Sequence, residues 1–227
     1  MNLNDFKLIV TSGPTREWLD PVRFISNPST GQTGWQIARN GLASFQEVVY
    51  ICGPAHKDYT NVPGARNVSV ITTEELARAV QQEVGPRTLL IMAAAPADFT
   101  PANPGEQKIK KTGDAGMTLQ LKPTTDVLIS VSDLDYPNFF RVGFAAETTD
   151  VREHALEKME RKKLHFVCAN RVFREEIGFG SHENTLFVLD RDGREEIIGP
   201  CSKERLAKDL LDYLILRMRA LSDSTVS

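Results

Sequence analysis

The chain has 227 residues, enough to bury a full hydrophobic core in one large domain or two small ones. Apolar residues make up 41% and charged residues 25%, with a formal net charge of −3. These values are typical of a soluble globular protein and argue against a nucleic-acid partner. No apolar run approaches the roughly 20 residues that cross a bilayer, so no membrane partner is expected either.

Predicted strands and helices alternate along the first half of the chain. We expect strands over residues 6–13, 47–53, 67–73 and 88–99, where apolar and β-branched runs end in small residues or turns. A helix is predicted from Ser29 and Thr30, its capping residues, to residue 45, and another over residues 73–84 with Thr73 as N-cap. Residues 14–28 read as a long polar connection.

The second half is less regular but continues this pattern. Strands are predicted over residues 117–123, 141–148 and 165–170, and helices over residues 150–163 and 202–221. Asp192 and Gly193 separate two apolar runs, which indicates a β-hairpin. The last helix has an apolar stripe of Leu206, Leu210, Leu214 and Met218. We therefore expect one α/β domain over residues 1–227, with a Rossmann-like, doubly wound, mainly parallel sheet and a β-hairpin extension.

The cysteines, histidines and N-terminus favour a cytoplasmic protein without a metal site of its own. Cys52, Cys168 and Cys201 have no CxxC spacing, which favours reduced thiols. None of the four histidines is spaced with a cysteine or a carboxylate as in a zinc site. The N-terminus contains acids and leads directly into a predicted strand, so we expect no signal peptide.

Three loops rich in small residues follow predicted strands. They are residues 11–15 (TSGPT), 93–98 (AAAPAD) and 144–148 (FAAET). In a doubly wound sheet, ligands bind beyond the carboxyl ends of the strands, where small side chains let backbone N–H groups approach a phosphate or a base. The helix start at residues 29–34 (STGQTG) adds a helix dipole. Such residues also simply pack where strands meet helices, but three of these loops at one edge favour a nucleotide site.

Two common nucleotide-binding motifs are missing from the sequence. An NAD-dependent oxidoreductase needs GxGxxG after the first strand and an acid at the end of the second. Here the first turn reads SGPTRE, and the second strand ends at Ile51, Cys52 and Gly53. A P-loop needs GxxxxGK[ST], which does not occur. The pattern therefore argues against a P-loop enzyme and disfavours an NAD-dependent oxidoreductase, which tight binding of NAD(P)H in a titration would bring back as an alternative.

Arg23 and Asn27 lie in the polar connection after the first strand. An arginine suits a carboxylate or a phosphate, and an asparagine can orient a carbonyl or an acyl phosphate. When each residue is considered alone, a surface salt bridge for Arg23 and a helix cap for Asn27 are the favoured explanations.

Two groups of lysines are candidates for binding an anion. Lys108, Lys110 and Lys111 follow a proline-rich segment that reads as a movable flap, and a lysine on a flap can neutralise a triphosphate. Lys158 and Lys162 share one helix face, where like charges repel unless they face an anion. A solvated edge strand and a solvated helix face are the structural alternatives.

Segments along nearly the whole chain resemble the phosphopantothenate–cysteine ligases of coenzyme A synthesis. The segments that carry the resemblance are TSGPTRE, LDPVRFISN, STGQTG, AAAPADF, EQKIKK, TTDVL, VGFAAET, LEKMERKKL, CANRV and GFGSHEN, in this order. The resemblance implies that CTP, or ATP in some members, activates 4′-phosphopantothenate as an acyl-nucleotide before the amine of L-cysteine attacks. It also implies Mg²⁺ with the triphosphate, a homodimer whose chains complete each other's sites, and a separate decarboxylase in the same pathway.

The resemblance also assigns roles to individual residues. Lys108 is expected to promote formation of the acyl-cytidylate, and Arg23, Asn27 and the backbone around Ala94 to assist its conversion by cysteine. The expected nucleotide-binding residues are Gly13, Met92, Ala93, Asp98, Thr124, Thr125, Asp126, Val127, Phe144, Lys158 and Lys162. The sequence departs from the usual pattern at Gln32, Pro96 and Arg171. A nucleotide-binding module without catalysis is the alternative function.

Overall fold

The computed structural model describes residues 2–111, 116–147, 150–171 and 184–224. An eight-stranded sheet runs through it in the order β12-β11-β10-β9-β6-β1-β4-β5. Six neighbouring strands are parallel, namely β10, β9, β6, β1, β4 and β5. At one edge of the sheet, β11 and β12 form an antiparallel hairpin. The strands are β1 (Lys7–Ser12), β4 (Glu47–Cys52), β5 (Arg66–Ser69), β6 (Thr88–Met92), β9 (Phe139–Glu147), β10 (Phe166–Arg171), β11 (Asn184–Asp190) and β12 (Glu195–Cys201).

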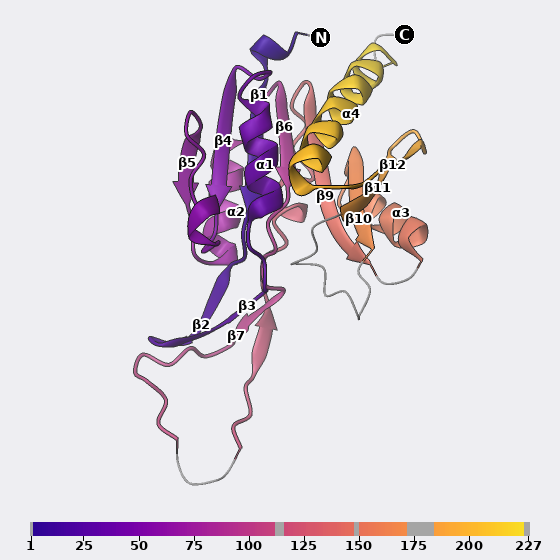
Figure 1. The fold of residues 1–227 in the computed structure, drawn as a ribbon. Coiled ribbons are helices and arrows are strands. Elements are labelled where there is room, and N and C mark those ends of the chain that lie inside the picture. The colour runs from indigo at the N-terminus through magenta and orange to yellow at the C-terminus, as the bar shows by residue number, and fades with distance from the viewer. Residues whose placement is uncertain (1, 112–115, 148–149, 172–183, 225–227) are drawn as a thin grey trace.

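Two layers of helices cover the sheet (Figure 1). α1 (Gln32–Gly41) and α4 (Lys203–Ser224) pack on one face, and α2 (Thr73–Glu83) and α3 (Val151–Arg161) on the other. Successive residues of β1 alternate between the layers, because Leu8 and Val10 face α1 whereas Ile9 faces α2. This arrangement confirms the predicted α/β, mainly parallel, doubly wound fold.

The chain leaves the centre of the sheet in opposite directions from β1 and β6. From β1 it proceeds through α1 to β4, on one face. From β6 it proceeds through the short helix η3 (Ile129–Val131) to β9, and then through α3 to β10, on the other face. A crevice forms where two parallel neighbours diverge in this way, at the carboxyl ends of their strands.

An arm extends from this same edge of the sheet (Figure 1). It contains the antiparallel hairpin of β2 (Arg16–Asp20) and β3 (Arg23–Ser26) and the antiparallel pair β7 (Phe99–Pro101) and β8 (Leu121–Pro123). The connection at residues 14–28 is therefore a hairpin and not a polar loop. Trp18 and Phe24 stabilise the hairpin through an edge-on contact with ring centroids 5.3 Å apart. Of the strand predicted over residues 117–123, only Leu121–Pro123 forms a strand, β8, where the chain pairs with β7.

Helix ends differ from the prediction at two places. α1 begins after Gly31 rather than at Ser29 and Thr30, because Gly31 adopts a φ of 82° in close contact with Ala55 and offers no side-chain cap. α2 is capped by Thr72, whose side chain and that of Glu75 form a capping box. The four predicted stripe residues of α4, by contrast, are all buried.

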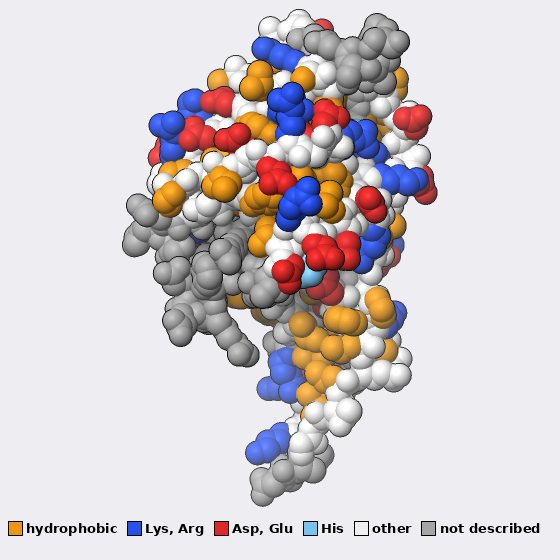
Figure 2. Space-filling view, turned by 90° about the vertical axis from the view of Figure 1, so that its right-hand side faces the viewer, with side chains coloured by type: hydrophobic (Ala, Val, Ile, Leu, Met, Phe, Trp, Pro, Cys, Tyr) orange, Lys and Arg blue, Asp and Glu red, His pale blue; other side chains and the backbone are white. Residues whose placement is uncertain are grey.

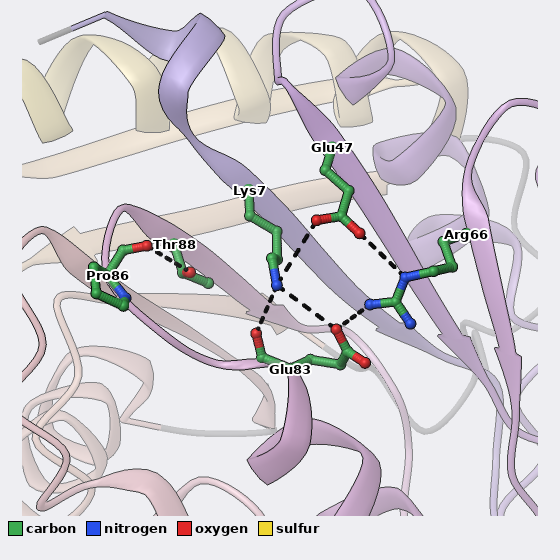
Figure 3. A network of polar contacts seen from close by, with 6 residues as sticks. All are labelled: Lys7, Glu47, Arg66, Glu83, Pro86 and Thr88. Atoms are coloured by element: carbon green, nitrogen blue, oxygen red, sulfur yellow. Dashed lines mark hydrogen bonds and ion pairs between the residues drawn. The ribbon is translucent and has the colours of Figure 1, made fainter.

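A polar network ties the amino ends of the strands together, opposite the arm (Figure 3). Lys7 Nζ lies 3.8 Å from Glu47 Oε2 and 3.7 Å from Glu83 Oε2, and it donates a hydrogen bond to the Glu83 carbonyl at 3.1 Å. Arg66 pairs with both glutamates. The network links β1, β4 and β5 to the end of α2, so it supports the fold at a distance from the crevice.

Candidate active site

A cavity of about 510 Å³ opens at the carboxyl ends of β6 and β9. The starts of α1 and α4 border it on one face of the sheet, and the turn at residues 124–128 and α3 border it on the other. Its position is the crevice in which doubly wound sheets hold ligands. The cavity therefore lies where the fold predicts a binding site.

The charged residues that line the cavity are three lysines and two aspartates: Lys158, Lys162, Lys203, Asp98 and Asp126. Lys162 Nζ lies 2.7 Å from Asp126 Oδ2, and Lys158 donates a hydrogen bond to the Phe144 carbonyl at 2.6 Å. The cavity thus has an excess of positive charge in a chain whose net charge is −3. Such an excess favours an anionic ligand.

The N-terminus of α1 adds a second source of positive potential. Gln32, Thr33 and Gly34 line the cavity; Gly31 offers no side-chain cap, and the Thr30 hydroxyl accepts only the first helical N–H, that of Gln32, at 3.4 Å. The first N–H groups of a helix lack intrahelical acceptors and readily bind an anion. Gly34 brings the helix close to β1, because a Cβ there would lie 2.6 Å from Ser12 Oγ. The glycine therefore helps to hold the helix end at the cavity.

Hydrogen bonds to neighbouring segments fix the loop after β6. The N–H groups of Ala94 and Ala97 donate to the hydroxyls of Thr11 and Thr15 at 3.2 and 2.9 Å. The Ala95 N–H donates to the Gly13 carbonyl at 2.9 Å. These bonds give the cavity a rigid wall of small residues.

The buried carboxylate of Glu17 is linked to the same loop through hydrogen bonds. Glu17 is only 5% exposed, and its Oε1 accepts hydrogen bonds from both the N–H and the hydroxyl of Thr73 at 2.8 Å. The Thr73 and Thr15 hydroxyls lie 2.9 Å apart. The arm hairpin, α2 and the loop after β6 are thus joined by one satisfied polar network.

Asn27 connects the base of the arm to the cavity loop. Its Nδ2 donates to the carbonyls of Ala95 and Pro96 at 3.2 and 2.9 Å. The side chain does not line the cavity, so its contact with the site passes through this loop.

Arg23 and Lys108 lie on the arm and not in the cavity of their own chain. The Asp20 carboxylate, 2% exposed, binds the Arg23 guanidinium and the Ile109 N–H, and Arg23 Nη2 donates to the Ile109 carbonyl at 2.5 Å. Burial by itself would raise the pKa of Asp20, but the Val22 N–H, Arg23 and the Ile109 N–H outweigh it and lower the pKa to about 2. The lysine run is therefore anchored to the hairpin at Ile109.

The structure brings most of the predicted site residues to one place. Those that line the cavity are Met92, Ala93, Ala94, Asp98, Thr124, Thr125, Asp126, Val127, Phe144, Lys158 and Lys162. Gly13 lies behind the wall, and Arg23, Asn27 and Lys108 lie outside the cavity. Gln32 and Pro96 line it, whereas the side chain of Arg171 lies outside the described residues.

Sequence reasoning missed several cavity residues that come from distant parts of the chain. Lys203 and Leu206 line it from the start of α4, and Thr73 from α2. The sequence pattern predicts Leu206 only as part of the buried stripe of its helix, and no local motif marks Lys203. Only the sheet order reveals that the last helix begins beside the site.

The described residues contain no group of three or more histidines, cysteines, aspartates or glutamates that could hold a metal ion. Mg²⁺ commonly binds through one or two carboxylates together with substrate phosphates. Asp98 and Asp126 are the carboxylates of the cavity, and the exposed Asp98 suits that arrangement. Within the same described ranges, no helix combines the length and apolarity needed to cross a membrane.

Sequence comparison identifies related proteins. Residues 3–217 match the family model described as the DNA/pantothenate metabolism flavoprotein C-terminal domain. The coenzyme A biosynthesis bifunctional protein CoaBC of Vibrio vulnificus (strain YJ016) is 36% identical over 213 residues, which are 93% of this chain and 52% of that protein. The chain therefore spans about half the length of the curated relatives it matches.

Solved structures share the fold. The crystal structure of the C-terminal domain of CoaBC has a TM-score of 0.76 at 26% identity, covering 98% of this chain and 100% of that domain. A Cab2 mutant in complex with phosphopantothenate-cysteine has a TM-score of 0.75 at 16% identity, covering 99% of this chain and 90% of that one. At this lower identity the likeness concerns the fold alone.

Proposed function

Because the chain belongs to the DNA/pantothenate metabolism flavoprotein C-terminal domain family, we propose that it is a ligase of coenzyme A synthesis that joins 4′-phosphopantothenate to L-cysteine. In the first step, the carboxylate of 4′-phosphopantothenate attacks the α-phosphorus of CTP, forming an acyl-cytidylate and releasing pyrophosphate. In the second step, the cysteine amine attacks the acyl carbon, forming the amide and releasing CMP and a proton.

The observation that carries this proposal is the positively charged cavity at the divergence of β1 and β6. Two anions, a triphosphate and a phosphorylated carboxylate, repel each other in a shared cleft unless cations lie beside them. Positive potential there comes from Lys158, from Lys162 and from the N-terminus of α1. Mg²⁺ bound with the triphosphate, next to Asp98, would neutralise further charge.

Lys108 is proposed to act in the first step by stabilising charge at the phosphates. Its position on the arm, outside the cavity of its own chain, agrees with a site that a second chain completes. Asn27 holds the carbonyls of Ala95 and Pro96, so it is proposed to orient the backbone wall against which the acyl group is converted.

A homodimer is proposed because the arm exposes apolar side chains that a monomer would leave in water. Figure 2 shows hydrophobic side chains gathered on the arm. The exposed apolar residues of its two hairpins and their connection are Val22, Phe24, Phe99, Ile109, Met117, Leu119 and Leu121. Clusters of this kind on a soluble protein commonly mark an interface. Sedimentation velocity tests the dimer; a purely monomeric wild type at micromolar concentration would contradict it.

Pyrophosphate release tests the reaction directly. Purified protein is incubated with 4′-phosphopantothenate, Mg²⁺ and either CTP or ATP, with and without L-cysteine. We expect pyrophosphate with CTP in both cases and the amide only with cysteine. Release with ATP instead would keep the ligase and change the nucleotide. Nucleotide binding without any release would favour the non-catalytic module.

A further inference from the structure

We propose that Lys203, at the start of α4, binds the polyphosphate of the nucleoside triphosphate in the cavity. This inference rests on the proposed function, because it assigns a further binding residue to the same site. Lys158 in α3 and Lys162, the C-cap residue of α3, reach the cavity on one face of the sheet, whereas Lys203 reaches it from the other. The three ammonium groups would therefore contact the phosphates from two sides.

The first argument is the lack of a local partner. Lys162 is paired with Asp126, and Lys158 donates to the Phe144 carbonyl. Across the ranges that the structure describes, Lys203 has no hydrogen bond or ion pair through its side chain, although it is half-buried. A half-buried ammonium without a counter-charge is unfavourable unless a ligand provides one.

The second argument is the position of Lys203 in its helix. It is the first residue of α4, a helix of 22 residues, and Ser202 precedes it as the residue that accepts the Arg205 N–H at 3.3 Å. The N-terminus of a helix carries partial positive charge, which disfavours a cation there. Burial also disfavours the charged ammonium and lowers the pKa of Lys203. A polyanion bound in the cavity would offset both effects by supplying a counter-charge.

The matched control is Lys208, on the same helix. Its Nζ lies 2.7 Å from Asp212, its side chain is 61% exposed, and it does not line the cavity. Lys208→Gln therefore removes the same charge from the same helix without touching the site. Lys203→Arg keeps the charge and should retain binding.

Isothermal titration calorimetry with Mg²⁺·CTP, CMP, inorganic tripolyphosphate and 4′-phosphopantothenate tests the assignment. For Lys203→Gln we expect the affinity for CTP and tripolyphosphate to fall roughly tenfold, as for loss of one charge-assisted hydrogen bond. The affinity for CMP should fall less, and Lys208→Gln should bind like the wild type. Unchanged CTP affinity, or a loss confined to 4′-phosphopantothenate, would overturn the assignment.

Thermal unfolding of the ligand-free protein separates this role from a structural one. A lysine that stabilises the fold would lower the unfolding temperature when it is replaced, whereas Lys203→Gln should leave it equal or raise it. A marked decrease would contradict the inference. If the wild type releases no pyrophosphate, the ligase reaction fails, but the tripolyphosphate titration still decides the role of Lys203.

Discussion

The Asp20 carboxylate and the Arg23 guanidinium form a close pair, with Arg23 Nη2 2.6 Å from Asp20 Oδ2, and together they hold both backbone groups of Ile109. Ile109 lies between Lys108 and Lys110, so this pair fixes the middle of the lysine run. A segment that its sequence marks as a movable flap is thus bound to the arm hairpin at one defined residue.

Replacing Asp20 should release the lysine run. Asp20→Asn replaces the carboxylate with a neutral amide, which weakens the bonds to Arg23 and to the Ile109 N–H. We expect trypsin to cleave at Lys108 and Lys110 roughly tenfold faster, because local opening limits cleavage of a bonded segment. Glu106→Gln, which removes a charge nearby without a bond to the pair, is the control. Equal cleavage rates in the wild type and Asp20→Asn would show that the pair does not hold the segment.

The same pair predicts a pH dependence. The pKa of Asp20 is lowered from 3.8 to about 2, so the folded state binds the proton more weakly than the unfolded state. The stability that Asp20 contributes is therefore complete above about pH 4 and is lost as the pH falls toward 2. Urea unfolding should show the difference in free energy between the wild type and Asp20→Asn shrinking over this window. A difference independent of pH would refute the assignment.

The sequence predicts the fold well but not the arm. Apolar runs of β1, β4 and β6 stand out because strands buried on both faces are continuously hydrophobic. β2 and β3 contain Arg16, Glu17 and Arg23, whose charges look like those of a loop until the buried partners of Glu17 and Asp20 are known. Tertiary contacts, and not local propensity, create this hairpin.

The sequence likewise predicts one part of the site and not another. The loop after β6 follows from its small residues and its place after a buried strand. Lys203 lies more than a hundred residues away from that loop, and only the order of the strands brings α4 beside it. A single sequence contains no signal for such a juxtaposition.

Lys108 and Asn27 should affect different half-reactions. Lys108→Ala should reduce pyrophosphate release by about a hundredfold or more, as for loss of a preorganised charge-stabilising group. Asn27→Ala should retain pyrophosphate release and lose most amide formation, because it disturbs the loop at Ala95 and Pro96. Rapid-quench measurement of both products separates the steps. Parallel losses in both variants would contradict the division of roles.

Asp190 and Arg217 form a buried pair that should be essential for the β11–β12 hairpin. Arg217 Nε lies 2.6 Å from Asp190 Oδ2, and Asp190 Oδ1 accepts the N–H groups of Asp192 and Arg194 at 3.0 Å. Asp190→Asn removes the buried carboxylate from Arg217 and leaves it only the half-exposed Asp192, 3.0 Å from Arg217 Nη2, so the substitution should cost about 3 kcal/mol. Asp209→Asn, which breaks an exposed pair with Arg205, should cost about 1 kcal/mol or less. Chemical unfolding of both variants measures this contrast; equal losses would contradict it.

Gly34 links the packing of the fold to the shape of the site. A Cβ at this position would lie 2.7 Å from Ser12 Cβ and 3.0 Å from the Thr11 carbonyl, so Gly34→Ala must push α1 away from β1. We expect a loss of about 1–3 kcal/mol in stability, as for overpacking of a core, together with weaker nucleotide binding because the helix end lines the cavity. Gly85→Ala is the control, because a Cβ there would meet nothing within 4 Å. Unfolding and calorimetric titration of the two variants test the link; a stable Gly34→Ala with wild-type affinity would show that the close approach of α1 is not required.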